Sequence, residues 1–132
     1  MRIQRLDHLV LTVTDPDRTV DFYHHGLGMR LEVFDDGRRA LAFGEQKINL
    51  HPVGHEIDPK AACPTPGSGD LCLVADRPAE EIHEHLRREG IPVELGPVRR
   101  TGALGPITSL YVRDPDHNLI EISTYESPRP AH

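Results

Sequence analysis

DHLVLTV (residues 7–13) is followed, after a single threonine, by DPD (residues 15–17). The first segment consists almost entirely of strand-forming residues and contains no turn former, so it predicts a strand. In the second segment, Asp15 can cap a helix and Pro16 suits the first helical position. Apolar residues then recur at helical spacing, at Val20, Tyr23 and Leu27. The chain is therefore predicted to open with a strand that runs directly into a helix.

The same order of elements is predicted twice along the chain. After the first helix, three short strands are expected at 30–34, 39–43 and 47–51, with turn-forming residues between them. A connector rich in Pro and Gly follows, and then a second series: a strand at 70–75, a helix opened by Pro78, and strands near Val93, at 108–113 and at 119–125. The predicted fold class is α+β, with two tandem βαβββ modules (module 1 about 4–54, connector 55–67, module 2 about 68–126). We expect a curved mixed sheet that forms a cup around a metal site, with the helices on its outer face.

Composition narrows the functional class. The chain has 132 residues and a formal net charge of −6, and no run of Lys or Arg forms a stripe that could neutralise phosphates, so no nucleic-acid partner is expected. No apolar stretch is longer than a strand and no signal peptide is recognised, so no membrane partner is expected either. With two cysteines, Cys63 and Cys72, the simplest interpretation is a reduced, cytoplasmic protein.

Strand alternation gathers polar residues on one side of the predicted sheet. In the first strand, His8 lies on the face opposite to the leucines that would pack on the helix. The same alternation places further polar side chains on that face, namely Asn49, His51, Asp70, Cys72, Glu121 and Ser123. An imidazole with carboxylates suits a divalent cation. The alternatives are that His8 is a satisfied core or surface histidine and that Glu121 is solvent-facing.

Two stretches carry a resemblance to a known family. LDHLVLTVTDPDRTVDFYHHGLGM near the start and YVRDPDHNLIE near the end resemble the vicinal oxygen chelate superfamily, which includes glyoxalase I, bleomycin-resistance proteins and extradiol dioxygenases. Within it, the fragments FGEQKINLH, PTPGSGDLCL and GPVRRTGALGPITSLYVRDPD look most like the glyoxalase-domain-containing protein 5 group. The resemblance covers nearly the whole chain.

The resemblance implies a ligand set for a divalent metal ion (Zn, Ni, Mn or Fe). His8 matches the first-strand metal histidine and Glu121 the last-strand metal glutamate. Asp70 stands where many relatives have histidine, and Asn49 where bacterial glyoxalase I has glutamate. Because an amide oxygen is a weak ligand for a transition metal, we expect His51 to reach in instead, opposite Asp70.

Other residues are expected to serve the substrate. By resemblance, Ser109 and Tyr111 contact substrate, although Tyr111 could equally pack at the sheet edge. The segment 99–105 could close as a lid, with Arg100 attracting an anionic substrate, or remain a solvated loop. The residue before Asn118 in the turn 114–118 is His117, where relatives have glycine. If that position needs a positive φ, histidine is tolerable there.

The resemblance implies a glyoxalase-like, metal-dependent enzyme of lyase or isomerase type that chelates adjacent oxygens of a small-molecule substrate. Glu121 is the expected base, Asp70 the second candidate, and the hydroxyl of Tyr111 a hydrogen-bond donor to the substrate. Two other functions stay open: a single-domain extradiol dioxygenase using ferrous iron, and a non-catalytic drug-binding resistance protein. The resemblance also implies a homodimer.

Overall fold

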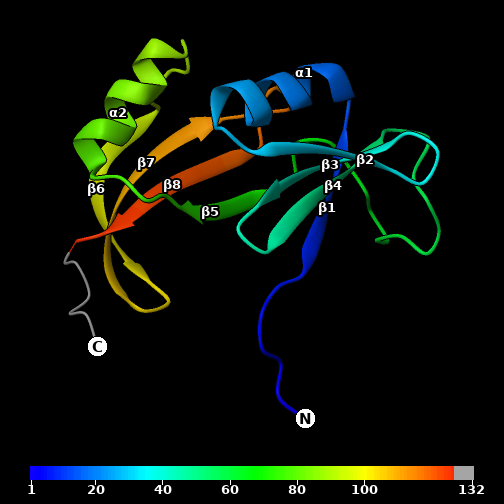
Figure 1. Ribbon diagram of the computed structural model, residues 1–132, viewed down its shortest axis with the longest axis horizontal. Helices are drawn as coiled ribbons and strands as arrows, with labels where there is room; N and C mark the ends of the chain where they lie inside the picture. Colours follow the sequence, from blue (N-terminus) through cyan, green and yellow to red (C-terminus); the bar gives the residue numbers. More distant parts are fainter. Residues whose placement is uncertain (127–132) are drawn as a thin grey trace. The chain divides into compact units, whose positions relative to one another are not determined.

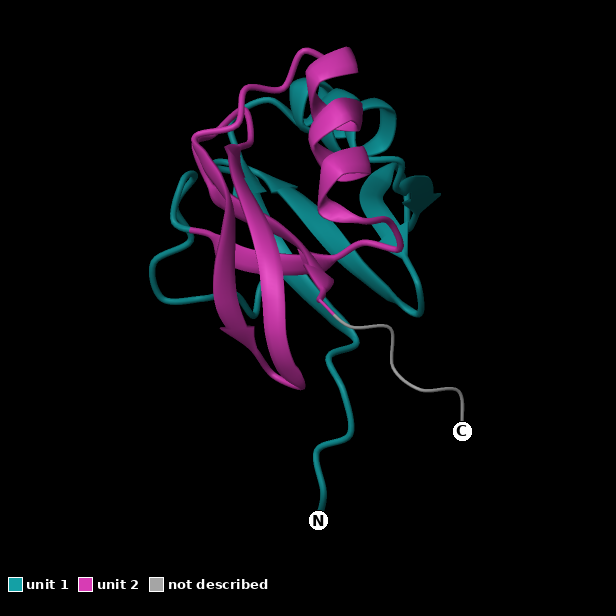
Figure 2. Ribbon diagram, turned by 90° about the vertical axis from the view of Figure 1, so that its left-hand side faces the viewer, with its two compact units in different colours: residues 1–68 teal, residues 69–132 magenta. Residues whose placement is uncertain are grey.

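The computed structural model describes residues 1–126, which form two consecutive units with the same order of elements (Figures 1 and 2). Unit 1 is Met1–Ser68 and unit 2 begins at Gly69. The elements of unit 1 are β1 (His8–Val13), α1 (Pro16–Val20), η1 (Asp21–Gly26), β2 (Arg30–Phe34), β3 (Arg38–Phe43) and β4 (Gln46–Pro52). Those of unit 2 are β5 (Asp70–Val74), α2 (Ala79–Arg88), β6 (Leu95–Gly102), β7 (Gly105–Arg113) and β8 (Leu119–Tyr125). The predicted α+β fold of two βαβββ modules is confirmed.

The first helix begins as its sequence predicts. The side chain of Asp15 accepts hydrogen bonds from the backbone N–H groups of Asp17 (3.0 Å) and Arg18 (3.4 Å), and Pro16 occupies the first helical position. The helix continues into the π-helical turn η1, which buries Tyr23 completely. This cap fixes where the chain leaves β1, and therefore which side of the sheet the helix covers.

Unit 1 has a four-stranded sheet in the order β1-β4-β3-β2. β1 runs parallel to β4, whereas the two other pairs are antiparallel. One face carries an apolar layer that is at most 6% exposed, made by Leu11, Val13, Leu41, Ile48 and Leu50. Arg39 lies on this face and reaches Asp17 of α1 at 2.8 Å, so this is the side on which the helix packs. The register therefore leaves His8, Asn49 and His51 on the opposite face.

Unit 2 repeats this arrangement, with the strand order β5-β8-β7-β6. α2 packs on β7 and β8 through Ile82 and Leu86, which are 5% and 1% exposed. The register pairs Cys72 and Tyr111 with Glu121 in the two neighbouring strands, so all three side chains lie on one face. The apolar residues of β8, Ile120 and Ile122, lie on the other.

One predicted segment folds differently. The segment 99–105, expected as a loop or lid, is a β-hairpin in which Arg99 pairs with Thr108 and Gly102 with Gly105. The strand expected near Val93 begins at Leu95 instead, and its register shifts between Leu95 and Val98. The glycines and prolines of this stretch suggested a loop, whereas they mark a bulge and a tight turn within a paired ribbon.

The turn between β7 and β8 is held by buried polar side chains. Asp114 Oδ1 accepts hydrogen bonds from the backbone of Asp116 (2.9 Å) and of Asn118 (3.0 Å), while Asn118 Nδ2 donates to Asp114 Oδ2 (2.7 Å). Asn118 Oδ1 in turn accepts from the backbone N–H of Gly69 at 2.6 Å, which ties the turn to the start of β5. His117 adopts φ of +66°, as the sequence suggested for this position.

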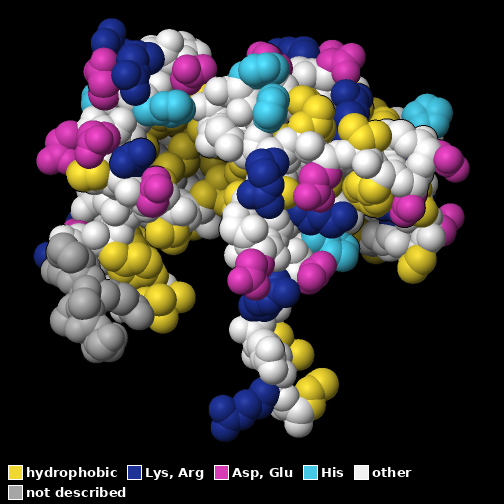
Figure 3. Space-filling view, viewed as in Figure 1, with side chains coloured by type: hydrophobic (Ala, Val, Ile, Leu, Met, Phe, Trp, Pro, Cys, Tyr) yellow, Lys and Arg dark blue, Asp and Glu magenta, His cyan; other side chains and the backbone are white. Residues whose placement is uncertain are grey.

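Two further features concern the length of the helices and the distribution of surface charge. Among residues 1–126, no helix is long and apolar enough to cross a membrane. On the face seen in Figure 3, basic and acidic side chains are interspersed rather than gathered by sign.

Candidate functional site

The unit 1 part of the candidate site begins at His8, the first residue of β1. Its Nδ1–H donates to Asp7 Oδ2 at 2.8 Å, and the side chain of His8 remains 45% exposed. This hydrogen bond also lowers the pKa of the Asp7 carboxyl. A carboxylate that fixes one ring nitrogen leaves Nε2 as a free acceptor, which is the usual arrangement of a metal-binding histidine. Asp7 was not singled out from the sequence, although an acid next to the candidate histidine was a visible signal.

Asn49 and His51 lie on the same face of β4, two residues apart. They are 5% and 7% exposed, and neither Asn49 Oδ1 nor His51 Nε2 has a hydrogen-bond partner. Burial lowers the pKa of His51, and the positive charge of Arg38 lowers it further, while Glu56 opposes the shift. The imidazole of His51 therefore loses its proton more readily than an ordinary histidine side chain. Two buried acceptors without donors are costly by themselves and suit a cation or a donor group supplied by a ligand.

The unit 2 part centres on Glu121 in the middle of β8. Ser109 Oγ donates to Glu121 Oε2 at 2.6 Å, and the hydroxyls of Ser109 and Ser123 lie 2.7 Å apart. Cys72 Sγ lies 3.1 Å from Ser123 Oγ. The hydroxyls of Ser109 and Ser123 and the thiol of Cys72 each carry one hydrogen that they can donate. With Ser109 donating to Glu121, Ser123 donates to Ser109, and Cys72 can donate to Ser123. This series of hydrogen bonds therefore ends at one carboxylate oxygen of Glu121, Oε2.

Both serines are completely buried, whereas Cys72 reaches solvent. Desolvation raises the pKa of the Cys72 thiol, the hydrogen bond to Ser123 opposes this, and the charge of Glu121 adds to it. Ser109 was expected to contact substrate, and the structure places its hydroxyl against Glu121. Strand alternation had placed Ser123 on this face without giving it a role.

Tyr111 and Arg100 form a pair on the same face of unit 2. Arg100 Nε donates to Tyr111 Oη at 3.0 Å, and its guanidinium carbon lies 5.5 Å from the centre of the Tyr111 ring. Tyr111 is the register partner of Glu121, so the phenol lies beside the carboxylate. Because its oxygen already accepts a hydrogen bond, the phenolic hydrogen is available to a ligand.

Asp70 stands at the start of β5, on the face of Cys72 and Glu121, and is exposed. Within residues 1–126, no three His, Cys, Asp or Glu side chains converge as a metal cluster. The predicted ligands His8, His51, Asp70 and Glu121 are therefore not gathered into one cluster among these residues. The donors present, imidazole nitrogens and carboxylate oxygens, nevertheless fit a divalent transition metal in their chemistry.

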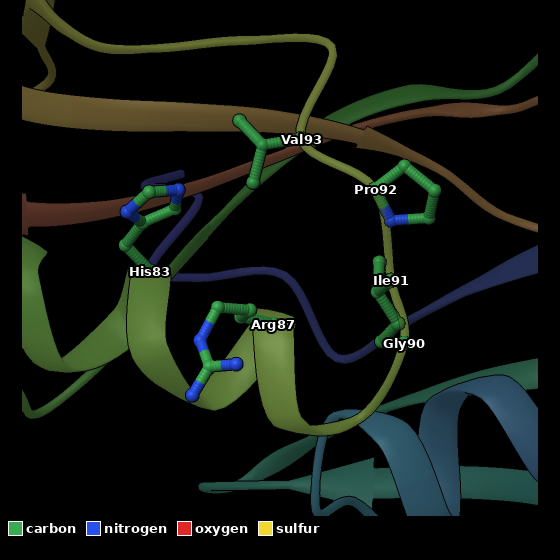
Figure 4. A pocket seen from close by; sticks show the side chains of 6 residues that line it. All are labelled: His83, Arg87, Gly90, Ile91, Pro92 and Val93. Atoms are coloured by element: carbon green, nitrogen blue, oxygen red, sulfur yellow. The ribbon is translucent and has the colours of Figure 1, made fainter.

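A shallow pocket of about 350 Å³ lies elsewhere in unit 2. His83 and Arg87 of α2 line one side, and the segment 90–93 lines the other (Figure 4). Arg87 is already bound to Glu84, with contacts of 2.6 and 3.0 Å. This pocket adjoins α2, which packs on the face of the sheet opposite to Glu121, so it does not extend the candidate site.

Comparisons with known proteins agree with the observed fold. The family model described as "Glyoxalase/Bleomycin resistance protein/Dioxygenase superfamily" matches residues 5–122. The chain is 55% identical to the glyoxalase domain-containing protein RDO1 of Mycosarcoma maydis over 126 residues, covering 96% of this chain and 71% of that protein. It is 52% identical to virulence protein STM3117 of Salmonella typhimurium, over 95% of this chain and 87% of that one. The crystal structure of STM3117 superposes with a TM-score of 0.93, covering 95% of this chain and 99% of that chain. A lactoylglutathione lyase of Neisseria meningitidis serogroup A is 30% identical over 89% of this chain and 88% of that enzyme.

Proposed function

Because the chain belongs to the glyoxalase/bleomycin resistance protein/dioxygenase superfamily, we propose that it is a glyoxalase-like enzyme of lyase or isomerase type. It uses a divalent metal ion to act on a small substrate that presents two adjacent oxygens. The observation that carries this proposal is the His8 imidazole, oriented by Asp7 with Nε2 left free. The relationship to a lactoylglutathione lyase supports the reaction class.

In this proposal each unit supplies one pair of ligands. The proposed ligands are His8 and His51 of unit 1, with Asn49 as the alternative because the register places it two residues closer to His8, and Asp70 and Glu121 of unit 2. The proposal includes a homodimer as the assembly. A zinc, nickel, manganese or iron ion bound by these ligands would act as a Lewis acid toward the adjacent substrate oxygens.

The side chains around the ligands have separate tasks. Ser109 donates to one oxygen of Glu121, Oε2, so the other oxygen, Oε1, is the one that can take a proton from the substrate. Asp70 is the second candidate for this role. Tyr111 donates its phenolic hydrogen to a substrate oxygen, and Arg100 holds the phenol in position. Ser109 therefore serves the substrate through Glu121.

Elemental analysis of purified protein tests the proposal, with His8→Ala and Glu121→Ala as variants. His25→Ala is the matched control, because His25 is an exposed histidine that pairs with Asp21 on η1. We expect close to one metal ion per site in the wild type and the control, and loss of the metal in both variants. Wild-type protein that binds no metal after reloading with each of the four cations would overturn the proposal and favour a non-catalytic, drug-binding protein.

A second candidate function is an extradiol dioxygenase. The buried, unpartnered Nε2 of His51 favours it, since His8, His51 and Glu121 would then form the two-histidine, one-carboxylate set typical of ferrous iron. Oxygen uptake with catechol after anaerobic loading with iron(II) tests this candidate. Uptake that is lost in His51→Ala would support it, and no uptake by the iron-loaded wild type would exclude catechol cleavage.

A further inference from the structure

Three buried polar atoms without a hydrogen-bond partner occur among residues 1–126, and all belong to unit 1. They are Arg38 Nε, Asn49 Oδ1 and His51 Nε2. Asn49 and His51 belong to the candidate site already described, whereas Arg38 has no part in the proposed chemistry. A buried N–H without an acceptor costs free energy, so its position calls for an acceptor from outside the protein.

The strand register brings Arg38 to the same face as the two other atoms. β3 pairs with β4 so that Ala40 lies opposite Asn49, and Arg38, two residues earlier, shares the face of Ala40. The positive charge of Arg38 lowers the pKa of His51, which agrees with this placement. Arg39, the next residue, points to the helix side and pairs with Asp17. The side chains of these two adjacent arginines therefore lie on opposite faces of the sheet.

The guanidinium of Arg38 is held in place by contacts that leave Nε unused. It lies 4.9 Å from the centre of the Phe34 ring, and its Nη1 is 3.7 Å from Asp35 Oδ2. The Nζ of Lys47 also lies over Phe34, at 4.0 Å, and adds a second positive charge to this face. Glu56 is the acidic group that acts on His51 from the segment after β4. Glu56 makes no hydrogen bond to Arg38 Nε, so the buried N–H of Arg38 still lacks an acceptor.

The chemistry of the three atoms is complementary. Asn49 Oδ1 is an acceptor, and the unpartnered His51 Nε2 is one whenever it carries no proton, so both can face a cation, while Arg38 Nε–H is a charged donor and suits an anionic oxygen. A carboxylate next to a hydroxyl or carbonyl group offers both features in one small molecule: adjacent oxygens for the cation and a negatively charged oxygen for arginine.

We propose that Arg38 recognises the substrate, and that the substrate is a small organic acid whose carboxylate accepts a hydrogen bond from Arg38 Nε. The adjacent-oxygen part of this inference rests on the proposed metal-dependent function. The recognition of the anion by Arg38 does not require the metal and is tested separately.

The experiment compares the binding of pyruvate with that of methyl pyruvate, its neutral ester, by isothermal titration calorimetry. The proteins are the wild type, Arg38→Gln and Arg39→Gln, each with and without added divalent metal. Arg39→Gln is the matched control, because Arg38 and Arg39 are neighbours in one strand and the side chain of each is 30% exposed. Arg38→Lys, which keeps a cation but not the Nε–H, serves as a second variant if Arg38→Gln does not fold.

We expect the wild type and Arg39→Gln to bind pyruvate about tenfold or more tightly than methyl pyruvate, and Arg38→Gln to lose this preference. Arg38→Lys should lose most of it. A wild type without preference for the anion, or an equal preference in the Arg38 and Arg39 variants, would overturn the inference. If the preference depends on Arg38 in protein that binds no metal, the inference about Arg38 stands and the metal-dependent function fails.

Discussion

Ser109 donates a hydrogen bond of 2.6 Å to Glu121 Oε2, although the two residues lie on neighbouring strands and are twelve positions apart in the sequence. Ser109 is fully buried, so this hydrogen bond is shielded from water. The carboxylate is thereby fixed at one oxygen before any ligand binds. A fixed carboxylate loses less conformational entropy on binding a metal, and this contact should therefore contribute to metal affinity.

Replacing Ser109 by Ala should weaken metal binding about tenfold, because Glu121 loses the donor that orients it. Competition with a chelator measures the affinity. Thr108→Ala is the control, since Thr108 lies on the other face of β7 and its hydroxyl pairs with Glu126 at 3.3 Å. Equal affinities in the two variants would show that Ser109 does not position the ligand.

Asp7→Asn should also lower metal affinity by about tenfold, since the amide is a poorer acceptor for the Nδ1–H of His8 and the imidazole becomes a weaker ligand. Asp17→Asn removes another exposed carboxylate, which pairs with Arg39 on the helix side, and it should leave the metal affinity unchanged. The same titration checks both. A loss in both variants would point to net charge rather than to the orientation of His8.

Asn118→Ala should destabilise the fold by about 2–4 kcal/mol. The substitution removes the hydrogen bonds of the side chain to Asp114 and to Gly69 and leaves the Gly69 N–H without its acceptor. Urea unfolding of the metal-free protein measures the change. A loss below about 0.5 kcal/mol would mean that water replaces the side chain.

His117→Gly should leave stability unchanged or raise it by up to about 1 kcal/mol. At φ of +66° the Cβ of histidine is sterically strained, whereas glycine has no Cβ, so the substitution removes this strain. Glycine also has greater conformational freedom in the unfolded chain, and this offsets part of the stabilisation. His117→Val should be clearly less stable than the wild type, because a β-branched residue tolerates this conformation poorly. A melting temperature of the valine variant equal to that of the wild type would contradict this explanation.

The ion pair between Glu94 and Arg113 should make a small contribution to stability that disappears in acid. Two hydrogen bonds from Arg113, of 2.9 and 3.1 Å, lower the pKa of Glu94 from its ordinary 4.5. The unfolded chain therefore binds a proton more readily, so the stabilisation is complete above pH 4.5 and is lost as the pH falls through the lower pKa of the folded state. Both side chains are partly exposed, so the effect is small.

A double-mutant cycle with Glu94→Gln and Arg113→Gln, followed by urea unfolding, measures this coupling. It should be present at pH 7 and weaker at pH 3. A coupling that grows in acid would mean that the two side chains interact through something other than the ionised carboxylate.

The sequence predicted the elements of the fold well because two local signals agree. The alternation of residues 8–13 defines both faces of β1, and Asp15 with Pro16 defines the start of α1. The segment 99–105 was expected as a loop or lid, and only the pairing of β6 with β7 makes it a hairpin. Such pairing depends on residues distant in sequence, which a local pattern does not contain.

For the candidate site, the alternation of side chains along each strand predicted which face each residue lies on, but not the contacts it makes. That signal placed His8, His51 and Glu121 on the polar faces, where the register also places them. It did not reveal the contacts of Asp7 with His8 or of Ser109 with Glu121, because hydrogen bonds depend on side-chain conformation. Arg38 was missed for another reason: its face follows from the register between β3 and β4, which the sequence alone leaves open.

The adjacent arginines of β3 make the length of the preceding turn a functional constraint. Asp35, Asp36 and Gly37 connect β2 to β3, and all three adopt a positive φ. Insertion or deletion of one residue there, with β3 shifted accordingly, would exchange Arg38 for Arg39 on the polar face and turn an alanine toward the helix. A change in loop length would then alter ligand recognition without replacing any residue of the site, so homologues with a longer or shorter turn should differ in specificity even where the arginines are retained.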